Sequence, residues 1–228
     1  MTTPLQNEVE NRRAGILLVD DHPIVIEGLT QLINQQQDLI VWGEASDSLG
    51  ALKAIETLKP NLAIVDISLK SGSGLDLIKS LQQRFPKLPI LVLSMHDESL
   101  YAERVLRAGA RGYITKQEAT EKLITAIRRV LDGEIYLNEK VTSKILSRVT
   151  GTSPAKNLSP INRLSDRELE VFQLIGQGHG TREIAELLHL SIKTVETYRE
   201  HIKEKLKLKD ATALVRYAVH WAEGEGKT

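Results

Sequence analysis

The sequence contains no cysteine among its 228 residues. This absence excludes disulfide bonds, thiolate catalysis and every cysteine-ligated zinc, haem or iron–sulfur site. Long hydrophobic runs are also missing, because no segment approaches the roughly 18 apolar residues that a membrane span needs. The polar stretch 1–13 carries no hydrophobic region of the signal-peptide type. We therefore expect a soluble cytoplasmic protein that is not exported and does not bind membranes.

The sequence also lacks net charge, since 30 Lys and Arg residues balance 30 Asp and Glu residues. A neutral chain has no global positive field to attract nucleic acid or an anionic membrane surface. Its 41% hydrophobic and 26% charged residues are typical of a globular protein with one or two cores. Any contact with DNA must therefore be made by a local surface.

The first half of the chain alternates short apolar runs with segments of helical spacing. Runs rich in β-branched residues lie at 16–19, 62–67, 90–94 and 112–115, with a weaker one at 40–43. Amphipathic helical patterns follow each of them. Five such units predict an α/β fold, a doubly wound five-stranded parallel sheet with helices on both faces.

The second half changes character after residue 131. Val141, Ile145 and Leu146 suggest a short helix, and 150–160 is a linker rich in Gly, Ser, Thr and Pro. From Leu164 onward only helical patterns occur, and Ser165 with Glu168 forms a capping box. We expect a domain at 14–132, a linker with a short helix at 133–162 and an all-α domain at 163–223.

Five polar residues lie at or near the ends of the predicted strands: Asp20, Asp21, Asp66, Ser94 and Lys116. Ligands of open α/β sheets bind at this edge, and a strand order of 2-1-3-4-5 would bring the three carboxylates together. Clustered carboxylates repel one another and are tolerable only with a protonated member or a bound cation. Carboxylate oxygens suit Mg²⁺, with phosphate oxygens as further ligands. A carboxylate could then form an aspartyl phosphate, with Lys116 and Ser94 contacting the phosphoryl oxygens.

Each of these residues also has an ordinary interpretation. Asp21 could cap the first helix, and Lys116 could be a solvated loop residue. The same carboxylates with Mg²⁺ could serve an enzyme that hydrolyses phosphoryl groups, although no second acid positioned for turnover is apparent and the helical domain would be unexplained. The hypothesis rests on the presence of all five residues at strand ends and not on any single one of them.

Short helices joined by tight turns predict a helix-turn-helix in the second domain. Residues 183–185 would belong to the supporting helix, 189–191 to the turn and 192–206 to the recognition helix, with Val195, Ile202 and Leu206 facing inward. The candidate DNA contacts are Lys193, Thr194, Thr197, Tyr198, Arg199 and Lys203. A helical module that binds protein instead of DNA is the alternative.

Residues 15–131 resemble a response-regulator receiver domain of the NarL/FixJ class, which has a flavodoxin-like fold. The resemblance rests on Asp20-Asp21-His22-Pro23 and on the run 108–116, which ends in Lys116. It implies that Asp66 is a phosphoacceptor served by a sensor histidine kinase. It also implies that Mg²⁺ is held by Asp21, by Asp20 mainly through water, by Asp66 and by the backbone carbonyl of Ser68. Ser94 would be the switch hydroxyl and Tyr113 its aromatic partner, although Tyr113 could also be plain packing.

Ser68 and His96 resemble positions that tune dephosphorylation in receivers, and His96 could equally be an exposed loop residue. We assign neither as catalytic.

Residues 163–223 resemble a LuxR-type DNA-binding domain through 164–171, Glu183-Ile184-Ala185 and 191–198. Glu196, Tyr198 and Glu200 depart from residues common in relatives, which affects particular base contacts and not the fold. The two resemblances together imply a transcriptional response regulator, switched by Mg²⁺-dependent phosphorylation of Asp66, that binds promoter DNA as a homodimer when active. They imply no enzymatic activity beyond the receiver's own phosphorylation and dephosphorylation.

Overall fold

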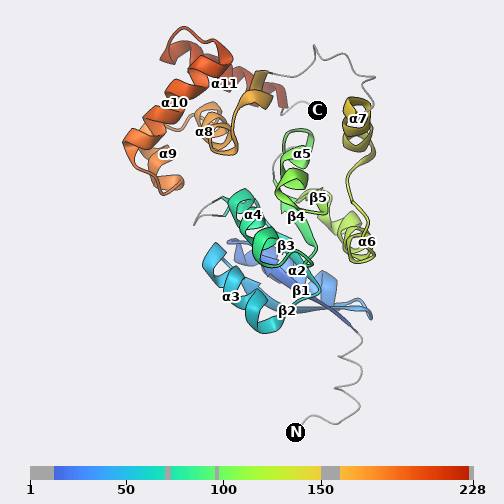
Figure 1. Ribbon diagram of the computed structural model, residues 1–228. Helices are drawn as coiled ribbons and strands as arrows, with labels where there is room; N and C mark the ends of the chain where they lie inside the picture. The colour runs from blue at the N-terminus through green and yellow to red at the C-terminus, as the bar shows by residue number, and fades with distance from the viewer. Residues whose placement is uncertain (1–12, 70–72, 96–97, 150–159, 226–228) are drawn as a thin grey trace. The chain divides into compact units, whose positions relative to one another are not determined.

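The computed structural model describes residues 13–69, 73–95, 98–149 and 160–225 (Figure 1). The chain divides into two compact units, Met1–Ser143 and Lys144–Thr228. The predicted linker positions 150–159 and the candidate residue His96 lie outside the described residues. Among the described helices, none is both long enough and apolar enough to cross a membrane.

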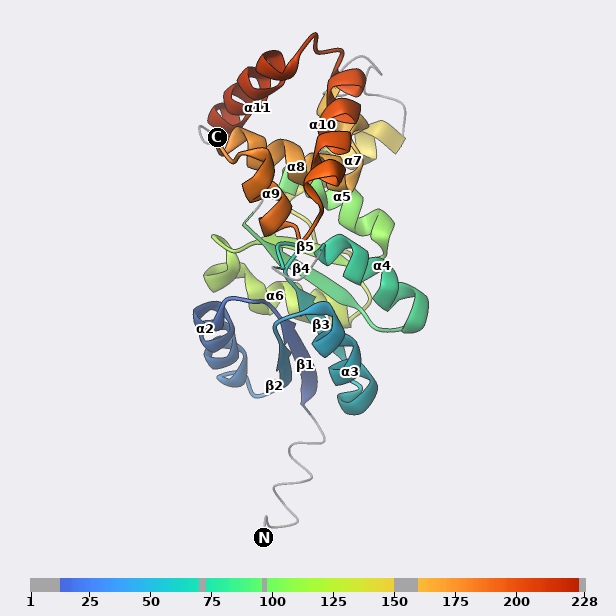
Figure 2. The same cartoon turned by 90° about the vertical axis from the view of Figure 1, so that its left-hand side faces the viewer.

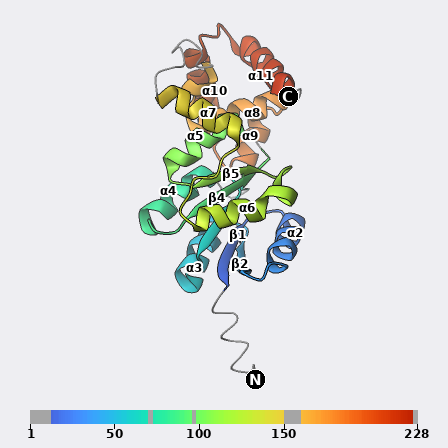
Figure 3. The ribbon, with the colours of Figure 1, turned by 90° about the vertical axis from the view of Figure 1, so that its right-hand side faces the viewer.

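The first unit is a parallel sheet with helices on both faces. Its strands pair in the order β2-β1-β3-β4-β5, which confirms the predicted doubly wound sheet. Helices α2 and α6 cover one face, and α3, α4 and α5 cover the other (Figures 2 and 3). The elements are β1 (Ala14–Val19), α2 (Pro23–Asn34), β2 (Leu39–Ala45), α3 (Ser48–Leu58), β3 (Leu62–Val65), α4 (Gly74–Arg84), β4 (Ile90–Ser94), α5 (Glu98–Ala108), β5 (Gly112–Thr115) and α6 (Ala119–Leu131).

The residues of the central strands explain this two-sided cover. Every residue of β3 and β4 is buried, as are all but the first residue of β1. Strands buried on both faces read as continuous apolar runs, because neither face is left for polar side chains. The polar residues are therefore displaced to the strand ends, where the candidate site begins.

Helix α2 begins at Pro23, whose fixed φ suits the first helical turn. Its N-cap is His22, with no side-chain capping bond. The alternative that Asp21 caps this helix is therefore wrong, because the helix starts one residue too late for that role. The Asp21 carboxylate instead lies against the His22 ring.

Both edges of the sheet depart from regular pairing. On the β2 edge the register jumps between Ile16 and Leu17, which leaves Trp42 without a partner on β1. The Trp42 ring lies over Gly15, where a Cβ would sit 2.1 Å from the indole. On the opposite edge, Tyr136 forms an isolated parallel bridge with Gly112 of β5. The sequence did not predict this bridge, because a single pairing leaves no periodic pattern.

Gly74, the first residue of α4, lies against the chain that follows β3. A Cβ there would sit 2.4 Å from the Asp66 carbonyl oxygen and 2.4 Å from Ile67 Cα, both of them backbone atoms that cannot rotate away. We expect Gly74→Ala to lower the free energy of unfolding by about 1–3 kcal/mol through overpacking.

Gly28→Ala is the matched control, since a Cβ at Gly28 within α2 meets nothing within 4 Å. It should raise the free energy of unfolding by about 0.5–1 kcal/mol, the usual gain of Ala over Gly in a helix. Denaturant unfolding of both variants measures the two changes. Equal effects would contradict the packing argument.

The second unit is wholly helical in the described residues. Helix α7 (Glu139–Val149) spans the boundary between the units, and the rest consists of η2 (Pro160–Arg163), α8 (Asp166–Gly176), α9 (Thr181–Leu187), α10 (Ile192–Leu206) and α11 (Ala211–Glu225). The predicted capping box is present at the start of α8. Phe172 of α8 packs against Tyr217 and Trp221 of α11, with ring centroids 5.9 and 5.4 Å away.

Candidate functional site

An acidic pocket lies at the carboxyl edge of the sheet. Asp20 and Asp21 directly follow β1, and Asp66 directly follows the neighbouring strand β3. The backbone N–H of Asp66 donates to the Val19 carbonyl of β1 at 2.8 Å. Asp20 and Asp66 are only 4% and 2% exposed. One ligand atom each of Asp20, Asp21, His22 and Asp66 lies within 4.8 Å of the others. The fold therefore concentrates three carboxylates in a small volume.

Lys116, which follows β5, provides a positive charge to this pocket. Its Nζ lies 2.6 Å from Asp20 Oδ2 and 2.7 Å from Asp66 Oδ2. The other oxygen of Asp66 accepts the backbone N–H of Ser68 at 3.0 Å. Asp66 is thus held by a cation on one oxygen and by a backbone dipole on the other, which fixes the orientation of its carboxylate.

The pKa values of Asp66 and Lys116 follow from the burial of both side chains. Desolvation raises the pKa of Asp66 above its ordinary value, although the hydrogen bonds from Lys116 and the Ser68 amide act in the opposite direction. Burial disfavours the charge of Lys116, but its hydrogen bonds to Asp20 and Asp66 outweigh that cost, so its pKa is raised. Lys116 therefore stays cationic beside the carboxylates.

His22 is a member of this cluster that the sequence did not single out. Its Nδ1 lies 2.9 Å from Asp20 Oδ1 and 2.9 Å from Asp21 Oδ1, and its backbone N–H donates to Asp20 Oδ1 at 2.9 Å. The position of His22 directly after two strand-end aspartates was the available signal. The ring is half exposed.

Ser94 and Tyr113 both lie in the sheet next to this pocket and are fully buried. Ser94 ends β4, and its carbonyl accepts the backbone N–H of Lys116 at 2.8 Å. Tyr113 pairs in register with Val92 of β4. The proposed switch residues are therefore on the two adjacent strands β4 and β5, and Ser94 is tied directly to the residue that contacts Asp66.

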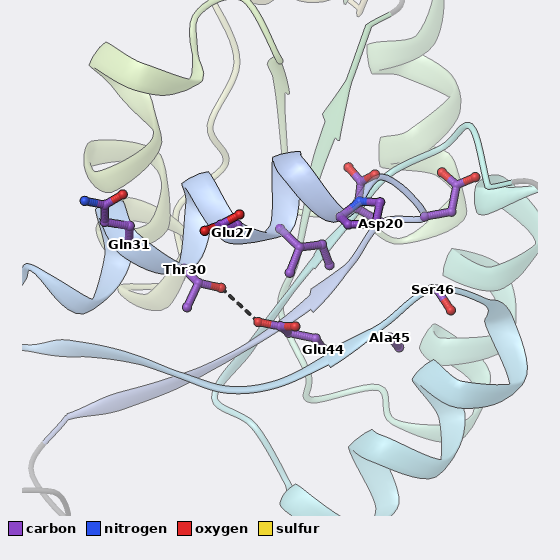
Figure 4. A pocket seen from close by; sticks show the side chains of 10 residues that line it. Asp20, Glu27, Thr30, Gln31, Glu44, Ala45 and Ser46 are labelled. Carbon is purple, nitrogen blue, oxygen red and sulfur yellow. Dashed lines mark hydrogen bonds between the residues drawn. The ribbon is translucent and has the colours of Figure 1, made fainter.

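A cavity of about 730 Å³ opens beside the carboxylates, between α2 and the end of β2 (Figure 4). Asp20 and Asp21 contribute to its wall, and Thr30 of α2 donates a hydrogen bond to Glu44 of β2 across it at 3.0 Å. Glu27 adds a further acidic side chain to the lining. The cavity therefore places two further carboxylates, those of Glu27 and Glu44, beside Asp20 and Asp21.

The second candidate surface is the recognition helix α10, whose bounds match the prediction. Val195 and Ile202 are buried and face the core. Among the candidate DNA contacts, Lys193 and Thr197 are exposed, whereas Thr194, Tyr198, Arg199 and Lys203 are partly buried.

Three of the candidate side chains already have partners, and one of them is Thr197, whose hydroxyl donates to the Lys193 carbonyl at 3.0 Å. The Thr194 hydroxyl lies 2.7 Å from the Ser191 hydroxyl at the N-cap, and Lys203 Nζ lies 2.8 Å from Glu200 Oε2. The exposed residues also include Glu196, Glu200 and Glu204. The outward face of this helix is therefore of mixed charge.

Comparisons with known protein families match both units. Residues 16–128 match the family described as response regulator receiver domain, and residues 162–218 match bacterial regulatory proteins of the luxR family. The chain is 39% identical over 208 residues to the oxygen regulatory protein NreC of Staphylococcus aureus, which covers 90% of this chain and 96% of NreC.

Solved structures agree with these matches. RcsB from Salmonella enterica serovar Typhimurium, bound to the promoter rprA in the presence of the phosphomimetic BeF3⁻, is 29% identical with a TM-score of 0.64, and the match covers 91% of this chain and 98% of RcsB. A structure of two RcsB dimers bound to two parallel DNAs is 31% identical with a TM-score of 0.55, covering 90% of this chain and 97% of that one.

A receiver-type sheet with an acidic pocket, followed by a helix-turn-helix unit, defines a two-component response regulator. The chain belongs to the NarL/FixJ class of response regulators, in which a receiver domain precedes a LuxR-type domain, and it is a DNA-binding regulator.

Proposed function

We propose that Asp66 is the phosphoacceptor and that Lys116, Ser94 and Tyr113 convert its phosphorylation into a change of the receiver. The observation that carries this proposal is Lys116 Nζ, which contacts both Asp20 and Asp66 at 2.6 and 2.7 Å. A phosphoryl group on Asp66 would compete for this ammonium. Ser94, whose carbonyl is bonded to the Lys116 amide, is placed to respond with its hydroxyl.

Mg²⁺ fits the donor set of the pocket. Carboxylate oxygens are the ligands that hard cations prefer, and three carboxylates with one ammonium leave negative charge for a cation to neutralise. Asp21 and Asp66 would hold Mg²⁺ directly, Asp20 mainly through water and Ser68 through its backbone carbonyl. When bound, Mg²⁺ stabilises the charge of the transferred phosphoryl group.

The phosphoryl donor in this proposal is the phosphohistidine of a sensor histidine kinase. An oxygen of the Asp66 carboxylate forms the new bond to phosphorus as the phosphorus–nitrogen bond of the donor breaks, and histidine leaves. Water later hydrolyses the acyl phosphate and restores the carboxylate. The receiver catalyses only these two steps, and Lys116 pairs with a phosphoryl oxygen in both.

The C-terminal unit would deliver this signal to promoter DNA. We propose boundaries of 14–132 for the receiver, 133–162 for the linker with its short helix, and 163–223 for the LuxR-type domain. The active form would be a homodimer, because two weak half-site contacts gain from effective concentration on one DNA. We propose that the protein acts in the cytoplasm, because a regulator that binds promoters acts where the chromosome is.

The test is selection of duplexes from fragmented host DNA by the purified full chain, with and without beryllofluoride and Mg²⁺. Enrichment of a few paired half-sites that depends on beryllofluoride is the expected result. Equal enrichment with and without beryllofluoride would overturn the phosphoryl switch. No enrichment in either state would overturn promoter binding and favour a protein partner for the helical domain.

Arg199 provides a test of the DNA contacts. We expect Arg199→Ala to weaken binding to all duplexes alike and to reduce the slope of log affinity against log salt by about one, as loss of one phosphate contact should. The measurement is a salt titration of binding by fluorescence anisotropy. Lys53→Ala removes an exposed positive charge from α3 of the receiver and is the control. An unchanged slope for Arg199→Ala would contradict a phosphate contact.

A further inference from the structure

The segment that follows α6 is bonded to the strand that carries the proposed switch residue Tyr113. The Tyr136 carbonyl accepts the backbone N–H of Tyr113 at 3.0 Å, and the Tyr136 N–H donates to the Arg111 carbonyl at 2.9 Å. The Tyr136 side chain packs against the hydrophobic core, and the Arg129 guanidinium lies 5.5 Å from the centre of its ring. A displacement of β5 at Tyr113 must therefore reach Tyr136 through the backbone.

A second contact joins the same segment to the other switch strand. Glu98 is the first residue of α5 and stands four residues after Ser94. It is a carboxylate only 4% exposed, and its Oε1 accepts the backbone N–H of Asn138 at 2.8 Å. Glu98 therefore holds residues 136–138 against the start of α5.

Asn138 also determines where the next helix begins. Its Oδ1 accepts the Val141 N–H at 3.0 Å, and its carbonyl accepts the Thr142 N–H at 2.9 Å, so Asn138 is the N-cap of α7. Helix α7 spans the boundary between the two units. The residue that starts this connecting helix is therefore bonded to the helix that begins four residues after Ser94, and Tyr136, two residues earlier, is bonded to Tyr113.

We propose that Glu98 and residues 136–138 form a latch that keeps the C-terminal unit in its resting state until the receiver is phosphorylated. Glu98 is a positioning residue in this device, because it acts through Asn138 and not on the phosphoryl group. Rearrangement at Ser94 and Tyr113 shifts the start of α5 against β5, breaks the bond from Asn138 to Glu98 and releases the start of α7. This inference rests on the phosphoryl switch proposed above.

The test compares wild type, Glu98→Ala and Glu98→Gln as full chains, on the duplex that wild type selects with beryllofluoride and Mg²⁺. Coupling of this kind changes affinity by about 5- to 150-fold. Without beryllofluoride, Glu98→Ala should bind the duplex almost as tightly as wild type binds it in the presence of beryllofluoride. Addition of beryllofluoride should increase the affinity of this variant only slightly. Glu98→Gln keeps an oxygen acceptor at the same place and should retain the wild-type response.

Amide hydrogen exchange of the wild type gives a second measurement that needs no variant. Peptides covering residues 134–143 should exchange slowly at rest and faster with beryllofluoride. Unchanged exchange in this segment, or a Glu98→Ala protein that responds as wild type does, would overturn the latch alone. If beryllofluoride does not change the DNA affinity of the wild type, the phosphoryl switch and the latch are both overturned.

Discussion

Asp66→Asn should take up no phosphoryl group from a small acyl-phosphate donor, and its DNA affinity should not respond to beryllofluoride. The Asn amide is a poor nucleophile and carries no negative charge for a cation. Allosteric coupling typically changes affinity by about 5- to 150-fold, so the variant should lose a gain of that size. The affinity without the mimic should stay near that of wild type.

Intact-protein mass spectrometry measures phosphoryl uptake, and anisotropy on the selected duplex measures the affinity. Asp76→Asn is the matched control, because it makes the same change at an exposed carboxylate on α4. That variant should take up one phosphoryl group and respond as wild type does. Uptake by Asp66→Asn equal to that of wild type would show that another carboxylate, such as Asp20 or Asp21, is the acceptor.

Glu168→Ala should destabilise the C-terminal unit by about 2–3 kcal/mol. Glu168 is only 3% exposed, and its carboxylate accepts the Ser165 N–H at 2.7 Å and the Lys205 ammonium of α10 at 2.6 and 2.8 Å. Charged hydrogen bonds of this kind contribute about 1.5–3 kcal/mol, and a lost helix cap costs about 1 kcal/mol. One side chain thus closes the capping box of α8 and joins it to the recognition helix.

The unfolding of this unit can be followed through Trp221, which packs on Phe172 of α8. The chain has two tryptophans, so a Trp42→Phe background leaves Trp221 as the sole reporter. Urea unfolding of Glu168→Ala in that background gives the change in free energy. A change below about 0.5 kcal/mol, the range of ordinary surface substitutions, would contradict the role assigned to Glu168.

The same carboxylate makes the stability of this unit depend on pH. Burial disfavours the ionised form of Glu168, but the bonds from Lys205 and Ser165 outweigh it and hold its pKa below the ordinary value. A group whose folded pKa is lowered stabilises the fold fully above its unfolded pKa of about 4.3, and this contribution disappears as the pH falls through the folded value.

The stability difference between wild type and Glu168→Gln should therefore be full at neutral pH and shrink below about pH 4.3. Glutamine keeps the shape and an oxygen acceptor but cannot ionise, so it isolates the charge. Urea midpoints of both proteins over this pH range give the measurement. A difference that is constant with pH would mean that the hydrogen-bonding shape, not the charge, stabilises the unit.

The alternation of strands and helices and the recognition helix could be predicted because each leaves a periodic signal in the local sequence. The apolar runs of β1, β3 and β4 and the bounds 192–206 of α10 depend on the local sequence and on burial. The gathering of Asp20, Asp21, Asp66 and Lys116 at one edge followed from the strand order. The ends of individual strands were predicted less accurately. Strand β2 covers Leu39–Ala45, whereas the predicted run was 40–43.

Contacts between single residues far apart in the chain were not predictable in the same way. Glu98 and Asn138 are 40 positions apart, and Lys205 and Glu168 are 37 apart. No spacing rule identifies such pairs, because they depend on how finished elements pack. His22 was missed for a related reason: its role depends on where the ring points, which the motif does not state.

The irregular edges of the sheet affect how this protein avoids aggregation. An open strand edge offers unpaired N–H and C=O groups to which another chain can add. On one side the bulge at Trp42 interrupts the regular ladder of β2, and on the other the bridge from Tyr136 covers part of β5. The bulge bends the outer strand β2 and the bridge covers part of β5, so both sides of the sheet are poor templates for the addition of another strand.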